Sequence, residues 1–135
     1  MHQDRYVLRT RTPHDPDTAD ARVRAALAAE GFGVLTEIDV TATLKAKLDV
    51  DTAPYRILGA CKPAYAHEAI SIDPMIGGLL PCNVVVREHP EGGSELIAID
   101  PAAMMGLTGD PALEGIAGQV AEELTRALES AAAEG

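Results

Sequence analysis

The stretch from Tyr55 to Ile99 constrains the fold more than any other part of the chain. It begins with an apolar, strand-like run that ends at Cys61 and continues into a helical pattern opened by Pro63. A turn with paired glycines then leads into a second apolar run that starts at Asn83. Strand-like runs bounded by turn residues are typical of neighbouring antiparallel strands. We therefore expect the other segments to pack around this central unit.

Five segments have the composition of strands. Each combines alternating or β-branched apolar residues with turn residues at its ends. They span residues 6–10, 33–39, 55–60, 83–87 and 95–99. In the second of them, alternation predicts that Val34, Thr36 and Ile38 share one face. The segment from His89 to Gly93 has the residues of a hairpin that joins the last two strands.

Two long helices are predicted at opposite ends of the chain. The first begins after the N-cap Asp15 and ends at Gly31, and the last begins after Asp110. Apolar residues recur along the last helix at steps of three and four, at Leu113, Ile116, Val120, Leu124, Leu128 and Ala131. Shorter helices are expected over residues 40–48 and 63–72, the latter with Ala66, Ala69 and Ile70 facing inward.

These elements predict one α+β domain over residues 1–135. It has two layers, an antiparallel sheet of about five strands backed by the two long helices. The segment from Met75 to Pro81 is apolar and rich in glycine, so we expect a turn that lies against the body. We expect Met104 and Met105, in a short irregular piece, to fill the core.

The charge and composition exclude several classes of function. The net charge is −10, with no tryptophan and one phenylalanine, so the chain lacks the basic surface and stacking platform that nucleic-acid binders need. Binding to an anionic membrane is disfavoured for the same reason. No apolar run approaches 18 residues, and the N-terminus lacks the apolar middle of a signal peptide. The expected location is the cytoplasm, where two cysteines stay reduced.

Three motifs carry a resemblance to a known family. They are RILGACKP at residues 56–63, GLLPCNVVV at residues 78–86 and IDPxxM at residues 99–104. With them the chain resembles family 302 of the domains of unknown function (DUF302) over nearly its whole length. The resemblance implies a fold of the TATA-box-binding-protein-like class and a homodimer, but no established activity or cofactor. The family commonly has Asn where this chain has Lys62, and Lys62 cannot cap the following helix with its side chain.

Two thiols form the candidate site. Cys61 ends one strand and Cys82 begins the next, so antiparallel pairing should bring them to the same sheet edge. We add Lys62, Pro81 and Asn83 as candidate ligand-binding residues. His67, one turn into the helix that follows Cys61, completes the candidate set.

The leading hypothesis is a small cytoplasmic module that binds a ligand or a partner at this edge. Met75 to Leu80 would form one wall of the site or the dimer contact. Thiolates suit Cu(I) or zinc, so Cys61 and Cys82 are candidate metal ligands. The first alternative is a redox enzyme that uses both thiols, and the second is a structural or interaction domain in which they are inert. The sequence identifies no cofactor, and Gly77-Gly78 is no phosphate loop.

Overall fold

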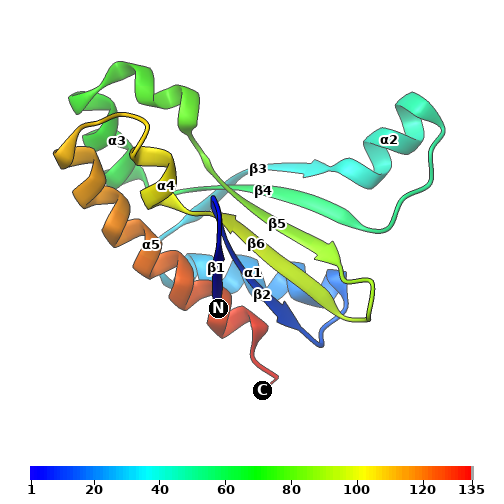
Figure 1. Ribbon diagram of the computed structural model, residues 1–135. Coiled ribbons are helices and arrows are strands. Elements are labelled where there is room, and N and C mark those ends of the chain that lie inside the picture. The colour runs from blue at the N-terminus through cyan, green and yellow to red at the C-terminus, as the bar shows by residue number, and fades with distance from the viewer. Residues whose placement is uncertain (135) are drawn as a thin grey trace.

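The computed structural model describes residues 1–134, which form an α+β fold around one open, six-stranded antiparallel sheet (Figure 1). The strands are β1 (His2–Asp4), β2 (Val7–Thr12), β3 (Gly33–Asp39), β4 (Tyr55–Cys61), β5 (Cys82–Glu88) and β6 (Ser94–Ile99). The helices are α1 (Pro16–Ala29), α2 (Val40–Leu48), α3 (Pro63–Ile72), the 3-10 helix η1 (Pro74–Leu79), α4 (Pro101–Met105) and α5 (Pro111–Ala132). The strand order is β1-β2-β6-β5-β4-β3.

The predicted fold class is confirmed, with one strand more than expected. The five predicted strands are β2 to β6, and the two long helices are α1 and α5. The additional strand β1 has only three residues, too few to show an alternating pattern. Most of the turn expected from Met75 to Pro81 belongs to the 3-10 helix η1. The piece after Asp100, expected to be irregular, contains the short helix α4.

Helix ends follow from local sequence. The side chains of Asp15 and Asp110 accept hydrogen bonds from the backbone N–H groups of Thr18 and Ala112, at 3.3 and 2.9 Å. A proline follows each of these caps at the first helical position, where its missing N–H removes no helical hydrogen bond. After α1, Gly31 has a φ of +87°, the left-handed conformation that commonly ends a helix.

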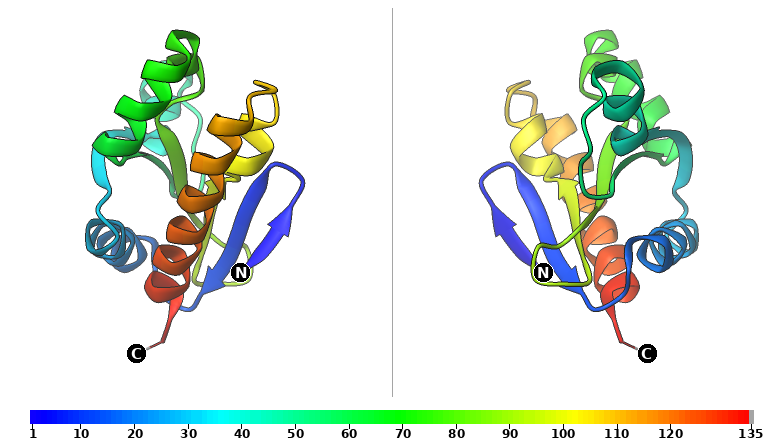
Figure 2. Two further views of the ribbon diagram at one scale, coloured as in Figure 1. Left: turned by 90° about the vertical axis from the view of Figure 1, so that its left-hand side faces the viewer. Right: turned by 90° about the vertical axis from the view of Figure 1, so that its right-hand side faces the viewer.

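One face of the sheet is covered by α1 and α5, as the views in Figure 2 show. The even-numbered residues of β2, β4, β5 and β6 turn toward these helices and form the sheet's part of the core. They include Leu8, Leu58, Ala60, Val84, Val86, Leu96 and Ala98. The apolar stripe predicted for α5 is buried at every position.

Two details of the side-chain pattern differ from prediction. The register between β3 and β4 shifts between Val34 and Thr36, so a bulge breaks the expected alternation at Leu35, which is 65% exposed. On α3, Ile70 is 45% exposed instead of inward. Ala66 and Ala69 face the body there, and α3 lies beyond the strand ends instead of along the sheet.

No helix of the described residues 1–134 lies across the other face of the sheet, which we call the open face (Figure 2). Its apolar residues are Val7, Ile38, Ile57, Val85, Ile97 and Ile99. One row crosses four strands without a break, from Ile38 through Ile57 and Val85 to Ile97.

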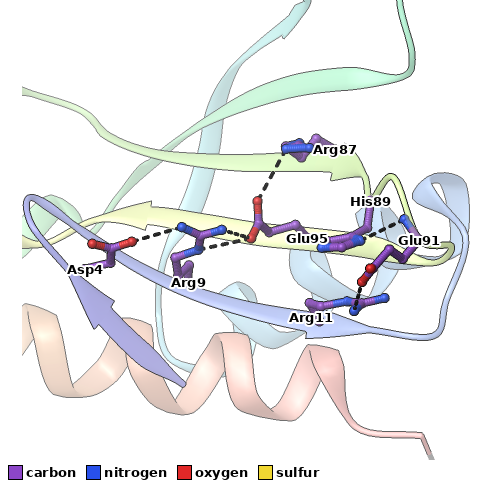
Figure 3. A network of polar contacts seen from close by, with 7 residues as sticks. All are labelled: Asp4, Arg9, Arg11, Arg87, His89, Glu91 and Glu95. Atoms are coloured by element: carbon purple, nitrogen blue, oxygen red, sulfur yellow. Dashed lines mark hydrogen bonds and ion pairs between the residues drawn. The ribbon is translucent and has the colours of Figure 1, made fainter.

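Arg9 extends this row onto β2, and Arg87 and Glu95 lie in the neighbouring row of the open face (Figure 3). Glu95 is only 4% exposed because Arg9 and Arg87 flank it. Arg9 donates two hydrogen bonds to one oxygen of Glu95, at 3.0 and 2.7 Å, and a third to Asp4. The carboxylate is therefore held by arginines and not by a covering element.

None of the helices within residues 1–134 is long and apolar enough to span a membrane.

Candidate functional site

A small cavity of about 40 Å³ lies where β4 ends and β5 begins, between these strands and the helices α3, α4 and α5. It is enclosed mainly by apolar side chains. Its lining includes Cys61, Cys82, Met104 and Met105, four of the six sulfur-bearing residues of the chain. A space of this size admits a single ion or one or two water molecules.

Four of the six candidate residues from the sequence meet at this cavity. Cys61, Lys62, Pro81 and Cys82 all line it. Asn83 does not, because it is exposed and borders a separate hollow on the open face. His67 is also exposed, on the part of α3 that points to solvent, and is not among the lining residues.

The two thiols occupy staggered positions on neighbouring strands. Cys82 lies directly opposite Ala60, and Cys61 is the next residue along β4. Because side chains alternate along a strand, Cys61 is directed toward the sheet face opposite to that of Ala60 and Cys82, although both cysteines are among the residues that line the cavity. Cys82 is buried, whereas Cys61 is half-buried at the strand end.

The buried position of Cys82 affects its protonation. Burial, with a smaller contribution from the nearby Cys61, raises the pKa of Cys82 to about 11. At neutral pH the Cys82 thiol is therefore protonated, and any ligand that needs a thiolate must displace its proton.

Lys62 ties the start of α3 to α5. It is the N-cap residue of α3, yet its side chain makes no capping hydrogen bond. Its ammonium group lies 3.0 Å from Glu123 of α5 and above the rings of Phe32 and Tyr65, at 5.6 and 4.9 Å from their centroids. Lys62 thus provides a link between two helices and no helix cap.

Glu123 is the residue of this cluster that sequence reasoning missed. Its Oε1 accepts hydrogen bonds from Lys62 and from the hydroxyl of Tyr65, at 3.0 and 3.1 Å, and the latter bond raises the pKa of Tyr65. Its Oε2 is buried without a hydrogen-bond partner. The sequence did hold a signal for Glu123, which lies three residues after Val120 and one before Leu124 on α5. A carboxylate so close to the apolar stripe is partly buried and needs a cation as partner.

Gly59 allows the strands to pack closely beside the cavity. A Cβ atom at this position would lie 2.2 Å from Thr36 Oγ1 and 2.8 Å from Pro81 Cγ. The side chains of β3 and of the turn before β5 therefore cross above Gly59, which helps to place Pro81 at the cavity wall.

Sulfur is the main potential metal donor among the residues that line the cavity. Within residues 1–134, no group of three or more His, Cys, Asp and Glu side chains could hold a metal ion. Structural zinc sites use four such ligands, so the cavity does not fit one. The thiols and thioethers instead match the donors that Cu(I) prefers.

Comparisons with known proteins agree on one family. The family model described as "Domain of unknown function DUF302" matches residues 8–131. An uncharacterized conserved protein DUF302 from Bacillus stearothermophilus superposes with a TM-score of 0.88 at 28% identity, covering 95% of this chain and 99% of its own. No curated protein matches.

Proposed function

We propose, from the premise that the chain belongs to the DUF302 family, that it is a small module that binds a soft ligand in the sulfur-lined cavity. The observation that carries this proposal is that Cys61, Cys82, Met104 and Met105 all line one small, apolar cavity. Thiolate and thioether sulfurs are the preferred donors of Cu(I). Cu(I) is therefore the ligand that we propose first.

The surroundings of the cavity support this ligand class. An apolar lining disfavours strongly hydrated ions such as Mg²⁺ and Ca²⁺, which bind oxygen donors. The ammonium group of Lys62 is directed to Glu123 and lies above two aromatic rings. This arrangement holds α3 and α5 together beside the cavity and restricts water access to the bound ion.

Competition with a Cu(I) chelator under anaerobic, reducing conditions tests the proposal. We expect one Cu(I) per chain in the wild type and at least 100-fold weaker binding in Cys61→Ala/Cys82→Ala. The matched control is Met75→Leu, because Met75 is 81% exposed and lies outside the lining. Equal Cu(I) affinity of the wild type and the double cysteine variant would show that Cys61 and Cys82 do not bind the metal.

A thiol-dependent redox enzyme is the second candidate. Cys61 favours it, since this half-buried thiol is more accessible than Cys82 and lies just before the N-terminus of α3. Attack of the Cys61 thiolate on a peroxide would give a sulfenic acid and an alcohol. Cys82 would then form the disulfide and release water. The raised pKa of Cys82 weighs against this second step.

Peroxide consumption with a thiol reductant separates the two candidates. The enzyme requires turnover that Cys61→Ser abolishes and Cys82→Ser slows. The binding module requires no turnover beyond that of free thiol. If neither Cu(I) binding nor turnover is found, the third alternative holds, and the thiols only pack the interior.

We also propose that the module acts as a homodimer in the cytoplasm and does not bind nucleic acid. Two free thiols persist in a reducing compartment, and the net charge of −10 opposes binding to phosphates. The homodimer is supported by the uncovered, largely apolar open face of the sheet, which is typical of an interaction surface.

A further inference from the structure

The cavity lined by Cys82 is smaller than the molecules that would deliver a ligand to it. Cys82 is only 8% exposed, and the cavity of about 40 Å³ has room for an ion or for one or two water molecules. A metal complex or a thiol reagent is larger than this space. It reaches Cys82 only when one wall of the cavity moves.

Most walls of the cavity belong to the core of the protein. The strands β4 and β5 are hydrogen-bonded neighbours in the interior of the sheet. The helices α4 and α5 line the cavity with Met104, Met105, Ile116 and Val120, all of which are buried. Movement of any of these elements would disrupt the core, so the mobile wall has to be α3.

The wall formed by α3 is the least firmly held. We call residues 62–79, which contain α3 and η1, the flap. Within the flap only Ala69 and Ile76 are buried. Toward the cavity, α3 presents Ala66 and Ala69, whose small side chains bury little apolar area. Figure 1 shows the flap beyond the ends of the strands, at the margin of the molecule.

Two glycines near the end of the flap provide a pivot. Gly77 and Gly78 do not have a positive φ, and a Cβ atom at either position would meet no other atom within 4 Å. Neither turn geometry nor packing therefore requires glycine here, and what the pair supplies is backbone freedom. Ile76 lies next to this pivot, where a rotation moves it least. Lys62, the single residue between β4 and α3, is the second pivot.

Glu123 of α5 fastens the flap at the start of α3. Its Oε1 accepts hydrogen bonds from Lys62 and Tyr65, and within residues 1–134 these are the only side-chain hydrogen bonds between the flap and the rest of the chain. Its Oε2 is buried without a hydrogen-bond partner. Opening breaks the two bonds but lets water reach Oε2, and the second effect offsets part of the first. The open and closed states are thereby brought closer in free energy.

We propose that the flap opens about Lys62 and the glycine pair to admit the ligand to Cys82, and that Glu123 is the latch that sets how often it opens. Glu123 is a positioning residue, because it acts through Lys62 and Tyr65 and does not line the cavity. Only the identity of the ligand rests on the proposed function, since the opening itself needs no ligand.

Alkylation of Cys82 by iodoacetamide measures the opening without any metal. All chains in this experiment carry Cys61→Ser, so that a single thiol is followed. We expect Glu123→Ala to raise the labelling rate by about tenfold or more, because both hydrogen bonds to the latch are lost. The matched control is Glu122→Ala, which removes the same charge at the next, exposed position of α5 and should leave the rate unchanged.

The glycine pivot has its own variant and control. Gly77→Ala/Gly78→Ala should slow the labelling of Cys82 by about threefold or more, because alanine restricts the backbone of the open flap. Gly115→Ala fills an equally uncrowded position on α5, outside the flap, and should leave the rate unchanged. A glycine-pair variant labelled as fast as the wild type would overturn the pivot.

Urea separates flap opening from global unfolding, which also exposes Cys82. The opening uncovers little surface, so below the unfolding transition the labelling rate should depend only weakly on urea in the wild type and in Glu123→Ala. A rate that rises with the full slope of global unfolding in both chains would overturn the flap. Equal rates in Glu123→Ala and Glu122→Ala would overturn the latch.

Stopped-flow transfer of Cu(I) from a chelator, in chains that keep both cysteines, tests the metal separately. Glu123→Ala should accelerate both association and dissociation while the dissociation constant stays nearly unchanged, a signature that loss of a metal ligand would not give. Cu(I) binding with rates unchanged in Glu123→Ala overturns the gate and leaves the metal site standing. Labelling that follows the flap in a chain that binds no Cu(I) removes the proposed ligand and supports the flap.

Discussion

The side chain of Lys62 does not cap α3 and instead forms a tertiary contact with Glu123 on α5. An Asn at this position would cap α3, whereas Lys62 reaches Glu123, and the side chains of this pair are only 24% and 14% exposed. A carboxylate this buried is costly once its cation is removed, because little water can take the place of the cation.

Removal of this cation should therefore destabilise the protein. We predict that Lys62→Met lowers the free energy of unfolding by about 1–3 kcal/mol, although methionine keeps the apolar stem over Phe32 and Tyr65. Adding Glu123→Gln to this variant should restore part of the loss, because no unpaired charge then remains. Urea denaturation measures both changes, and a Lys62→Met variant as stable as the wild type would refute the link between the helices.

Cys82 should make stability depend on pH in the alkaline range. Its pKa is raised from 9.0 to about 11 in the folded chain, so between these values the unfolded chain loses the proton first. Stability should be fully present below pH 9 and fall by about 2–3 kcal/mol as the pH rises through 11. Denaturation at pH 8 and pH 10.5 should show a smaller difference in Cys82→Ala than in the wild type, and equal differences would contradict a buried thiol.

Gly59 sets how closely β3, β4 and the turn before β5 approach one another. We predict that Gly59→Ala destabilises the protein by about 1–3 kcal/mol, since its Cβ would overlap Thr36 Oγ1 at 2.2 Å. Thr36→Ala in the same chain should recover part of this loss, while the contact with Pro81 remains. A double-mutant cycle from thermal or urea unfolding measures the coupling, and strictly additive effects would place the strain elsewhere.

Elements were predictable from sequence where the local signal is strong. Asp15 and Asp110 cap the helices that they were expected to cap, and the apolar steps of α5 match its buried side. The bulge at Leu35 was not predictable, because no local pattern marks the register shift that brings Thr36 opposite Gly59. Ile70 was wrongly predicted to face inward, because α3 packs at the end of the sheet through Ala66 and Ala69.

The site was predictable only in part, because it depends on the arrangement of the complete chain. Adjacent antiparallel strands bring the ends of β4 and β5 together, so the sequence indicated Cys61, Cys82, Lys62 and Pro81. Met104 and Met105 were expected in the core, but no local pattern connects them to the two cysteines. They reach the cavity because α4 follows β6 and folds back between the sheet and α5.

Cu(I) affinity should rise with pH if the cavity binds the metal through thiolates. The Cys82 thiol is protonated at neutral pH and must release its proton on binding. We predict that the apparent affinity increases about tenfold for each pH unit between pH 6 and 8 through Cys82 alone. Chelator competition at several pH values measures this slope, and Cys82→Ala should reduce it by one proton. A slope that Cys82→Ala leaves unchanged would exclude Cys82 as a ligand.

X-ray absorption spectroscopy at the copper edge tests the proposed function most directly. The protein is loaded with one equivalent of Cu(I) under reducing conditions, and the ligand shell of the metal is determined. The four sulfur-bearing residues that line the cavity predict a shell of sulfur atoms only, which loses one scatterer in Cys82→Ala. A shell dominated by nitrogen or oxygen, or a sulfur shell that is unchanged in Cys82→Ala, would contradict a metal site in this cavity.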